Sequence, residues 1–185
     1  MPLVFATTNF GKLQEVRAML PFEVTHLPIH LPEIQALDVD EVVRAKAEWG
    51  YEHVGVPVLV EDTGLAFTAW NGLPGALIRW FMESVGSKGL CRMLSGEDDR
   101  GAVAKCVFDL FDGHEHRLFS GLVQGTIALA PRGQNGFGWY DILIPNGHTV
   151  TFAEMPVGQR HTLTMRKLAV DQLRMFLESS NLNEQ

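Results

Sequence analysis

The rhythm of apolar and polar positions changes about halfway along the chain. In the first half, apolar runs at residues 3–7, 23–29 and 56–62 have the length and composition of buried strands. Between these runs, apolar residues recur every three or four positions, which predicts one helix over about 12–20 and another over about 38–49. Strands that alternate with helices in this way favour a sheet with parallel neighbours.

Hairpins dominate the second half. Apolar runs at 104–111 and 116–128 are joined by a turn at Asp112 and Gly113, which predicts two antiparallel strands. The other elements expected are a helix within 71–85, a short helix at 87–94, a strand at 138–145 and a final helix from about Thr162 to Leu177. The whole pattern therefore predicts a mixed α/β sheet with an antiparallel extension.

Composition narrows the class of protein. The length of 185 residues predicts a single domain, 1–185, and a hydrophobic content of 46% allows a core of useful size. The net charge of −7 argues against nucleic-acid binding, although a local basic pocket for a small anion remains compatible with it. No apolar run approaches the roughly 20 residues that span a bilayer. The start "MPLVFATTNF" also lacks the pattern of a signal peptide, so we expect a cytoplasmic protein without membrane contact.

The two cysteines and one histidine pair suggest no strong metal site. Cys91 and Cys106 have no metal-ligand spacing and are expected to be small, buried and reduced. In "HEH", His114 and His116 follow the predicted hairpin turn and point to the same side, but the sequence indicates no third ligand.

The stretch "VEDTGLAF" places two carboxylates, Glu61 and Asp62, directly after an apolar run. Burying an unpaired carboxylate is strongly unfavourable, so its charge must be compensated. Mg²⁺ together with a polyphosphate is one compensation, because Mg²⁺ is usually held by one or two carboxylates plus substrate phosphates. An acid that is not a metal ligand could instead orient or deprotonate a water molecule. Glu33, in "HLPEI", is a further candidate acid that taken alone is equally a surface charge.

A second polar stretch, "TTNFGK", follows the first predicted strand. Thr7, Thr8 and Asn9 lead into a helix that opens with Gly11 and Lys12. Backbone N–H groups at a helix N-terminus favour an anion, and a lysine there adds a positive charge suited to phosphate. A polar turn with a solvated lysine explains the same residues equally well.

Three later motifs supply further candidates. Arg79 follows the turn "NGLPG" and is either a ligand contact or a surface residue of an amphipathic helix. In "NGFGWYD", glycines present Phe137, Trp139 and Tyr140, which could stack on a nucleobase or seal a hairpin. Arg160 precedes the final predicted helix, and Arg166 and Lys167 fall in its first turns, where cations either face an anion or are solvated.

The order of these motifs resembles one family. "T-x-N-x-x-K", "L-P-E", "V-E-D-T-G-L", "N-G-L-P-G", "F-G-W" and "A-E-M" before a basic helix look like the inosine triphosphate pyrophosphatases, over nearly the whole chain. The resemblance implies an elongated mixed β-sheet with flanking helices, two lobes around a central cleft, and a homodimer. It also implies a Mg²⁺-dependent reaction that cleaves a deaminated purine nucleoside triphosphate between the α- and β-phosphates, giving a monophosphate and pyrophosphate.

The motifs and the resemblance together define an expected site. The expected catalytic residues are Asp62, Lys12 and Glu61, and the expected metal ligands are Glu33 and Asp62. The expected substrate-binding residues are Thr7, Thr8, Asn9, Lys12, Lys46, Thr63, Arg79, Phe137, Trp139, Tyr140, Arg160, Met165 and Arg166.

This chain departs from the family pattern where the resemblance assigns reading of the 6-oxo purine edge. Tyr140 stands at the acidic position, Arg160 replaces a lysine, Thr164 replaces a serine and Met165 replaces a histidine, while Arg166 is kept. Methionine cannot donate the hydrogen bond that histidine can. The same reaction with a shifted preference, for a modified or pyrimidine base, is therefore an alternative. A nucleotide-binding protein without catalysis is a second alternative, and the retained acids Glu33, Glu61 and Asp62 argue against it.

Overall fold

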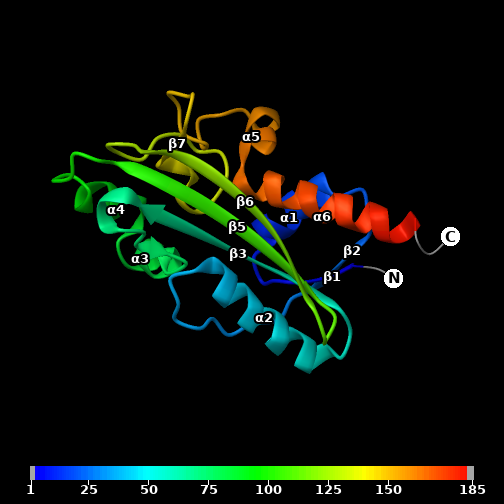
Figure 1. The fold of residues 1–185 in the computed structure, drawn as a ribbon. Coiled ribbons are helices and arrows are strands. Elements are labelled where there is room, and N and C mark those ends of the chain that lie inside the picture. Colours follow the sequence, from blue (N-terminus) through cyan, green and yellow to red (C-terminus); the bar gives the residue numbers. More distant parts are fainter. Residues whose placement is uncertain (1–2, 183–185) are drawn as a thin grey trace.

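The computed structural model describes residues 3–182 and shows an elongated sheet with helices on both faces (Figure 1). The strands are β1 (Leu3–Ala6), β2 (Val24–Leu27), β3 (Val58–Phe67), β4 (Pro74–Gly75), β5 (Gly101–Phe111), β6 (His116–Ile127) and β7 (Leu143–Pro145). The helices are α1 (Phe10–Met19), α2 (Val39–Val54), α3 (Ile78–Ser84), α4 (Gly86–Met93), α5 (Val157–Leu163) and α6 (Met165–Leu182), with short 3₁₀ helices η1 (Thr68–Trp70) and η2 (Gly138–Asp141).

The strands form one seven-stranded mixed sheet in the order β2-β1-β3-β5-β6-β7, with β4 also paired to β3. β1 is parallel to both β2 and β3, whereas all the other pairings are antiparallel. The predicted mixed sheet with an antiparallel extension is therefore confirmed, as is the hairpin of β5 and β6.

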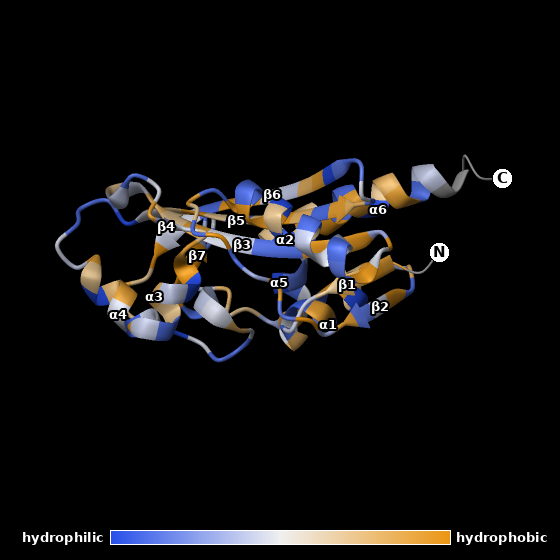
Figure 2. Cartoon of the chain, turned by 90° about the horizontal axis from the view of Figure 1, so that it is seen from below, coloured by the Kyte–Doolittle hydropathy of each residue, from blue (hydrophilic) through white to orange (hydrophobic). Residues whose placement is uncertain are grey.

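The two faces of the sheet bury separate cores. Helix α2 packs on one face, over Val58, Val60 and Val107. Helices α1 and α6 pack on the other face with the larger core, which includes Leu59 and Phe108 (Figure 1). In Figure 2, orange apolar segments alternate with white and blue ones along the strands and helices, whereas several outer loops are blue. Consecutive residues of β3 enter different cores because side chains of a strand alternate between faces.

Two predicted boundaries in the first half were wrong. Strand β3 does not end at Asp62 but runs to Phe67, because its ladder with β5 continues as far as the pair Phe67 and Ala102. Helix α2 does not end near Trp49 but continues to Val54, where Gly55 adopts the left-handed conformation that commonly ends a helix.

Two predicted elements near the C-terminus were also wrong in part. The strand expected at 138–145 is the 3₁₀ helix η2 followed by the short strand β7; Gly138 has a φ of +61°, which is incompatible with a strand. The single helix expected at 162–177 is two helices, α5 and α6, separated by Thr164 in an extended conformation. The hydroxyl of Thr164 accepts a hydrogen bond from the N–H of Lys167 at 3.2 Å, which caps the start of α6.

Both cysteines are free and buried, as expected. Within residues 3–182, no helix combines the length and the hydropathy that crossing a bilayer requires.

Candidate active site

A gap in the sheet positions the candidate site. One edge of β3 pairs with β1 at Val58 and Leu59, and the same edge pairs with β4 at Leu65 and Ala66. Among residues 3–182, no strand pairs with the segment 60–64 on that side. This segment contains the two acids of the "VEDTGL" motif, so the acids lie inside a long strand and beside an opening in the sheet.

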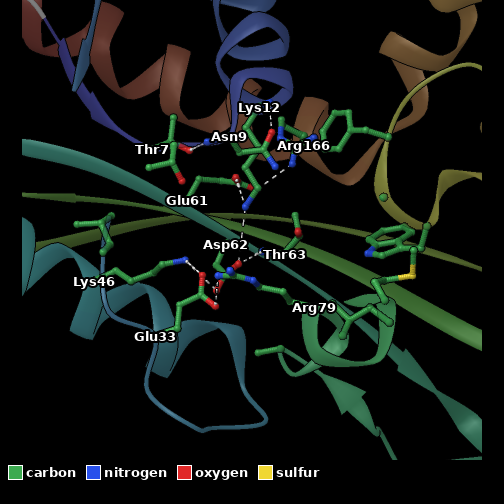
Figure 3. Close-up of a pocket in the computed structure, with 18 of the residues that line it drawn as sticks. Thr7, Asn9, Lys12, Glu33, Lys46, Glu61, Asp62, Thr63, Arg79 and Arg166 are labelled. Atoms are coloured by element: carbon green, nitrogen blue, oxygen red, sulfur yellow. Dashed lines mark hydrogen bonds and ion pairs between the residues drawn. The ribbon is translucent and has the colours of Figure 1, made fainter. Parts of the chain in front are cut away.

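The two adjacent carboxylates leave the strand toward opposite faces. Glu61 follows the alternation of Leu59 and contacts the face covered by α1 and α6, whereas Asp62 follows Val60 toward α2 (Figure 3). Gly64 is required next to them for packing, since a Cβ there would lie 2.7 Å from the Cγ2 atom of Val39 in α2. One strand thus supplies acids to both sides of the opening.

Glu61 lies at the centre of a buried ionic network. Its carboxylate lies 2.8 Å from Nζ of Lys12 and accepts hydrogen bonds from Arg166 Nη2 and Cys106 Sγ, both at 3.1 Å. Burial alone would raise the pKa of Glu61, but the charges of Arg166 and Lys12 outweigh burial and lower it to about 2. Glu61 therefore stays ionised, and the cost of burying its charge is offset by two cations.

Lys12 is correspondingly held in its charged form. Burial would lower the pKa of the Lys12 ammonium, but the neighbouring carboxylates of Glu61 and Asp62 raise it above its ordinary value. Its Nζ atom also lies 3.7 Å from Oδ1 of Asp62. Lys12 is therefore paired with the acids. The alternative interpretation, a solvated lysine in a polar turn, does not account for these contacts.

A second cation faces the acids from α2. Nζ of the buried Lys46 lies 2.8 Å from Oε1 of Glu33 and 3.3 Å from Oδ2 of Asp62. Arg79 Nη1 approaches the other Glu33 oxygen at 3.5 Å, and Arg79 Nε donates to Glu83 at 2.7 Å. Partial burial opposes ionisation of Glu33, but the charge of Lys46 outweighs it and lowers the pKa of that carboxyl.

The polar turn after β1 is held by local hydrogen bonds. Oδ1 of Asn9 accepts the N–H of Lys12 at 3.1 Å and so caps α1, while the Asn9 N–H donates to Thr7 Oγ1 at 3.1 Å. His26 Nε2 lies 2.8 Å from the backbone oxygen of Thr7, which ties the turn to β2. These contacts fix where the N-terminus of α1 points.

The acids include a pair of candidate metal ligands. Oε1 of Glu33 lies 2.8 Å and Oδ2 of Asp62 3.3 Å from Nζ of Lys46, so the two carboxylates lie on either side of this ammonium group. Two hard oxygen ligands, completed by water and phosphate, are a set that Mg²⁺ commonly uses. Among residues 3–182, no group of three or more His, Cys, Asp or Glu side chains is arranged so that it could hold a metal ion.

These groups surround one cavity of about 490 Å³ (Figure 3). The expected site residues that line it are Thr7, Thr8, Asn9, Lys12, Glu33, Lys46, Glu61, Asp62, Thr63, Arg79, Phe137, Trp139, Tyr140, Met165 and Arg166. The lining comes from β1, α1, α2, β3, α3, the aromatic segment and α6, so segments far apart in the sequence meet around the opening of the sheet.

Arg160 is the exception. It lies within α5 instead of before the helix, it is not part of the cavity lining, and its guanidinium carbon lies 5.7 Å from the centre of the Tyr140 ring. Arg160 therefore packs behind the aromatic wall. The sequence could not indicate that Arg160 lies within a helix, because the apolar spacing does not reveal the break between α5 and α6 at Thr164.

The aromatic end of the cavity is more buried than a glycine-rich segment suggests. Trp139 and Tyr140 are buried, with exposures of 5% and 2%, and their rings meet edge to face at 5.6 Å. Phe137 is half-buried, and the guanidinium carbon of Arg166 lies 5.4 Å from the centre of its ring. Both proposed roles of these aromatics, lining a ligand cavity and sealing packed structure, are therefore present in one cluster.

Three site residues were missed. Glu15 is buried and forms an ion pair with Arg166, Cys106 donates to Glu61, and His26 supports the turn at Thr7. Glu15 could have been suspected, since it lies three positions after Lys12 and so on the same side of α1. The other two depend on tertiary contacts that leave no mark in the local sequence.

The histidine pair near the hairpin turn lies in a different environment. His116 Nδ1 is 2.6 Å from Oδ2 of Asp109, and its Nε2 is 3.3 Å from Oε1 of Glu48. The two carboxylates lie on opposite sides of the ring, so they bind the histidine instead of converging on a metal position.

The sequence of this chain is similar to those of one known protein family. A sequence model of the Ham1 family matches residues 3–176. The inosine triphosphate pyrophosphatase of Schizosaccharomyces pombe is 45% identical over 181 residues, which cover 96% of this chain and 95% of that protein. The inosine triphosphate pyrophosphatase of Yarrowia lipolytica is 42% identical over 182 residues, covering 96% of each.

Solved structures agree with the fold. The HAM1 protein from Coxiella burnetii superposes with a TM-score of 0.84 at 27% identity, covering 97% of this chain and 99% of that chain. A nucleoside-triphosphatase described as a dITP/XTP pyrophosphatase, from Mycobacterium abscessus, superposes with a TM-score of 0.73 at 29% identity over 94% of this chain and 98% of that chain.

Proposed function

This chain belongs to the Ham1 family, and from that membership we infer that it is a hydrolase of acid anhydrides, a nucleoside triphosphate pyrophosphatase. Its substrates are inosine- and xanthosine-type triphosphates, in the ribose or deoxyribose form, and its products are the nucleoside monophosphate and pyrophosphate. We propose Mg²⁺ as the divalent metal that this reaction uses.

The observation that carries the proposal is that charged and aromatic side chains lie at different ends of this cavity. One end gathers the cations Lys12, Lys46 and Arg79 around the acids Glu33 and Asp62. The other end is walled by aromatic side chains. A ligand with a charged chain at one end and a flat ring at the other matches this distribution, and a nucleoside triphosphate is such a ligand.

The chemistry divides among the residues of the charged end. Glu33 and Asp62 would hold Mg²⁺, which supplies charge neutralisation for the phosphates when it is bound. Lys12, Lys46 and Arg79 bind phosphate oxygens, and the N-terminus of α1 adds backbone N–H groups near Thr7, Thr8 and Asn9.

Asp62 and Glu61 have different tasks in this scheme. Asp62 reaches the cavity between two lysines and orients the attacking water or accepts its proton. Glu61 is already bound by Lys12, Arg166 and Cys106, so we assign it to holding Lys12 in place. Thr63, next in the strand, offers its hydroxyl to the same end of the cavity.

A specific observation favours a second candidate, the same reaction with a shifted base preference. Met165 is buried and lines the aromatic end, where it presents a thioether in place of a hydrogen-bond donor. A site that lacks a polar partner for the base edge discriminates less well. Changing Met165→His, which supplies a hydrogen-bond donor at this place, should then raise the preference for inosine triphosphate over adenosine and guanosine triphosphates.

The experiment that tests both candidates is a panel of nucleoside triphosphates with pyrophosphate detection. The panel includes inosine, xanthosine, adenosine, guanosine and pyrimidine triphosphates, each with and without Mg²⁺. Highest kcat/KM for inosine or xanthosine triphosphate supports the first candidate, and a pyrimidine or modified base at the top supports the second. Absence of pyrophosphate from every member contradicts both.

We also propose that the protein is a cytoplasmic homodimer of one domain per chain, acting on free nucleotides and not on nucleic acid. The resemblance of the whole chain to the pyrophosphatases supports this proposal. Light scattering during size-exclusion chromatography should give twice the chain mass of 20.6 kDa, and a mass of one chain would contradict the dimer.

A further inference from the structure

We propose that Tyr140 is a positioning residue for Arg166, and that its hydroxyl sets how strongly this enzyme prefers a base with a carbonyl oxygen at its edge. The proposal rests on the function proposed above, because it concerns the base end of the same cavity. It assigns the tyrosine to the guanidinium of Arg166 and not to direct contact with the base.

Arg166 is almost fully buried and has more donors than partners. Its Nη1 donates to a carboxylate oxygen of Glu15 and, at 3.1 Å, to the hydroxyl of Tyr140, and its Nη2 donates to Glu61 at 3.1 Å. Its exposure is 1%, and the Nε atom has no hydrogen-bond partner among the described residues. Arg166 lines the cavity, so the unpaired donor belongs to a residue of the ligand site.

The hydroxyl of Tyr140 connects both partners of Nη1. It accepts from Arg166 at 3.1 Å and donates to the same oxygen of Glu15 at 3.4 Å. Burial raises the pKa of the Tyr140 hydroxyl, so the group stays protonated and can play both parts without adding a charge. Both hydrogens of Nη1 are thereby used, which fixes the plane of the guanidinium.

The tyrosine ring is itself held on several sides. Its centre lies 5.3 Å from that of Phe137, 5.6 Å from Trp139 and 5.4 Å from Phe152. Gly136 permits this packing, because a Cβ at that position would lie 2.5 Å from Cδ2 of Tyr140. A rigidly placed hydroxyl can define the orientation of a neighbouring side chain, whereas a mobile one cannot.

The consequence concerns the base. A buried N–H without a partner is costly, and a ligand that supplies an acceptor removes that cost. A ring carbonyl is such an acceptor, whereas an exocyclic amino group or a C–H is not. The contribution of the carbonyl depends on the orientation of the guanidinium, and therefore on the Tyr140 hydroxyl.

The test compares inosine triphosphate, which has a carbonyl at C6 and a hydrogen on N1, with purine riboside triphosphate, which has a C–H at C6 and no hydrogen on N1. For Tyr140→Phe, we expect the ratio of their kcat/KM values to fall about tenfold, since a hydrogen bond to a charged donor loses its alignment. The value for purine riboside triphosphate should fall less than the value for inosine triphosphate. Tyr51→Phe is the matched control, because Tyr51 is the other tyrosine of the chain and packs on Phe111 outside the cavity.

Each result separates the alternatives. An equal fall for both substrates would show a merely structural role, and an unchanged ratio would remove Tyr140 from specificity; either result overturns the proposal. If Tyr140→Phe does not fold, Glu15→Gln provides the test, because it weakens the contact among Glu15, Tyr140 and Arg166 and keeps the tyrosine. A lower ratio of the two kcat/KM values supports the proposal, and an unchanged ratio overturns it. Failure of the parent protein to cleave either triphosphate overturns the proposed function itself, which distinguishes the two failures.

Discussion

Nζ of Lys12 lies 2.8 Å from Oε2 of Glu61, and the side chain of Glu61 is completely inaccessible to solvent. The pair joins the first turn of α1 to the middle of β3, across the point where β1 and β3 part. It explains how a chain can place an acid inside an apolar strand, because the compensating cation comes from the neighbouring helix. It also gives Lys12 two tasks, to neutralise Glu61 and to face the ligand cavity.

Lys12→Ala should therefore affect both binding and stability. KM for the triphosphate should rise, because a phosphate contact made before reaction contributes to binding. The free energy of unfolding should fall by on the order of 3 kcal/mol, because Glu61 is left with one cation fewer in a buried site. Steady-state kinetics and urea denaturation measure the two effects.

The double variant Lys12→Ala with Glu61→Gln separates these tasks. Removing the buried charge together with its partner should restore most of the lost stability, while KM should stay high. Unchanged KM and kcat in Lys12→Ala would remove this lysine from phosphate binding.

Glu61 should make the protein sensitive to acid. Burial opposes its ionisation, but Arg166 and Lys12 lower its pKa from the ordinary 4.5 to about 2. Because the folded pKa is the lower one, the ionised group contributes stability above about pH 4.5, and this contribution is lost as the pH falls toward 2. The full difference corresponds to about 3 kcal/mol.

Urea denaturation at pH 5.5 and pH 3 measures this contribution. Glu61→Gln should show a smaller loss of stability between these two values than the parent protein. Identical pH dependence in both proteins would mean that Glu61 does not carry the linkage.

Local patterns sufficed for much of the fold. The hairpin of β5 and β6 was predictable because its signals, apolar residues in a strand pattern and an Asp-Gly turn, are local features of the sequence. The end of β3 was not, because its last five residues are ordered by pairing with β5, and partner length is a tertiary property. Thr164 shows the same limit, since its role as a helix cap depends on how α5 and α6 meet.

The sequence likewise indicated some residues of the candidate site and not others. Lys12, Glu33, Asp62 and Arg79 could be proposed because their motifs combine a chemical type with a turn or strand that presents it. Arg160 was misplaced for the opposite reason, since a basic residue near a helix carries no signal of whether it faces the ligand or packs behind Tyr140. The partners that orient the others, such as Cys106, come from distant strands.

Asp62→Asn should lower kcat by about 100-fold or more, which is within the contribution of a positioned proton acceptor. The fold should persist, because the ion pairs of Lys46 with Glu33 and of Lys12 with Glu61 remain in the variant. Asp38→Asn is a matched control, since Asp38 caps α2 outside the cavity and asparagine caps helices equally well. Full Mg²⁺-dependent activity of Asp62→Asn, with an unchanged melting temperature, would remove Asp62 from the mechanism.

Glu33→Gln should raise the Mg²⁺ concentration for half-maximal activity by about tenfold or more, because it removes one of the two carboxylates that we propose as metal ligands. Glu83→Gln removes a carboxylate from the same cavity that is bound instead to Arg79, and it should leave the Mg²⁺ requirement within about twofold. A titration of activity with Mg²⁺ compares the two variants. Equal Mg²⁺ requirements would place the metal elsewhere.

The central claim is that this protein cleaves a nucleoside triphosphate between its α- and β-phosphates, and the products of inosine triphosphate test it most directly. The protein, Mg²⁺ and inosine triphosphate are combined, and the reaction is stopped early and resolved by ³¹P NMR and anion-exchange chromatography. We predict inosine monophosphate and pyrophosphate in equal amounts from the first time point. Inosine diphosphate and orthophosphate as the first products would contradict the assignment.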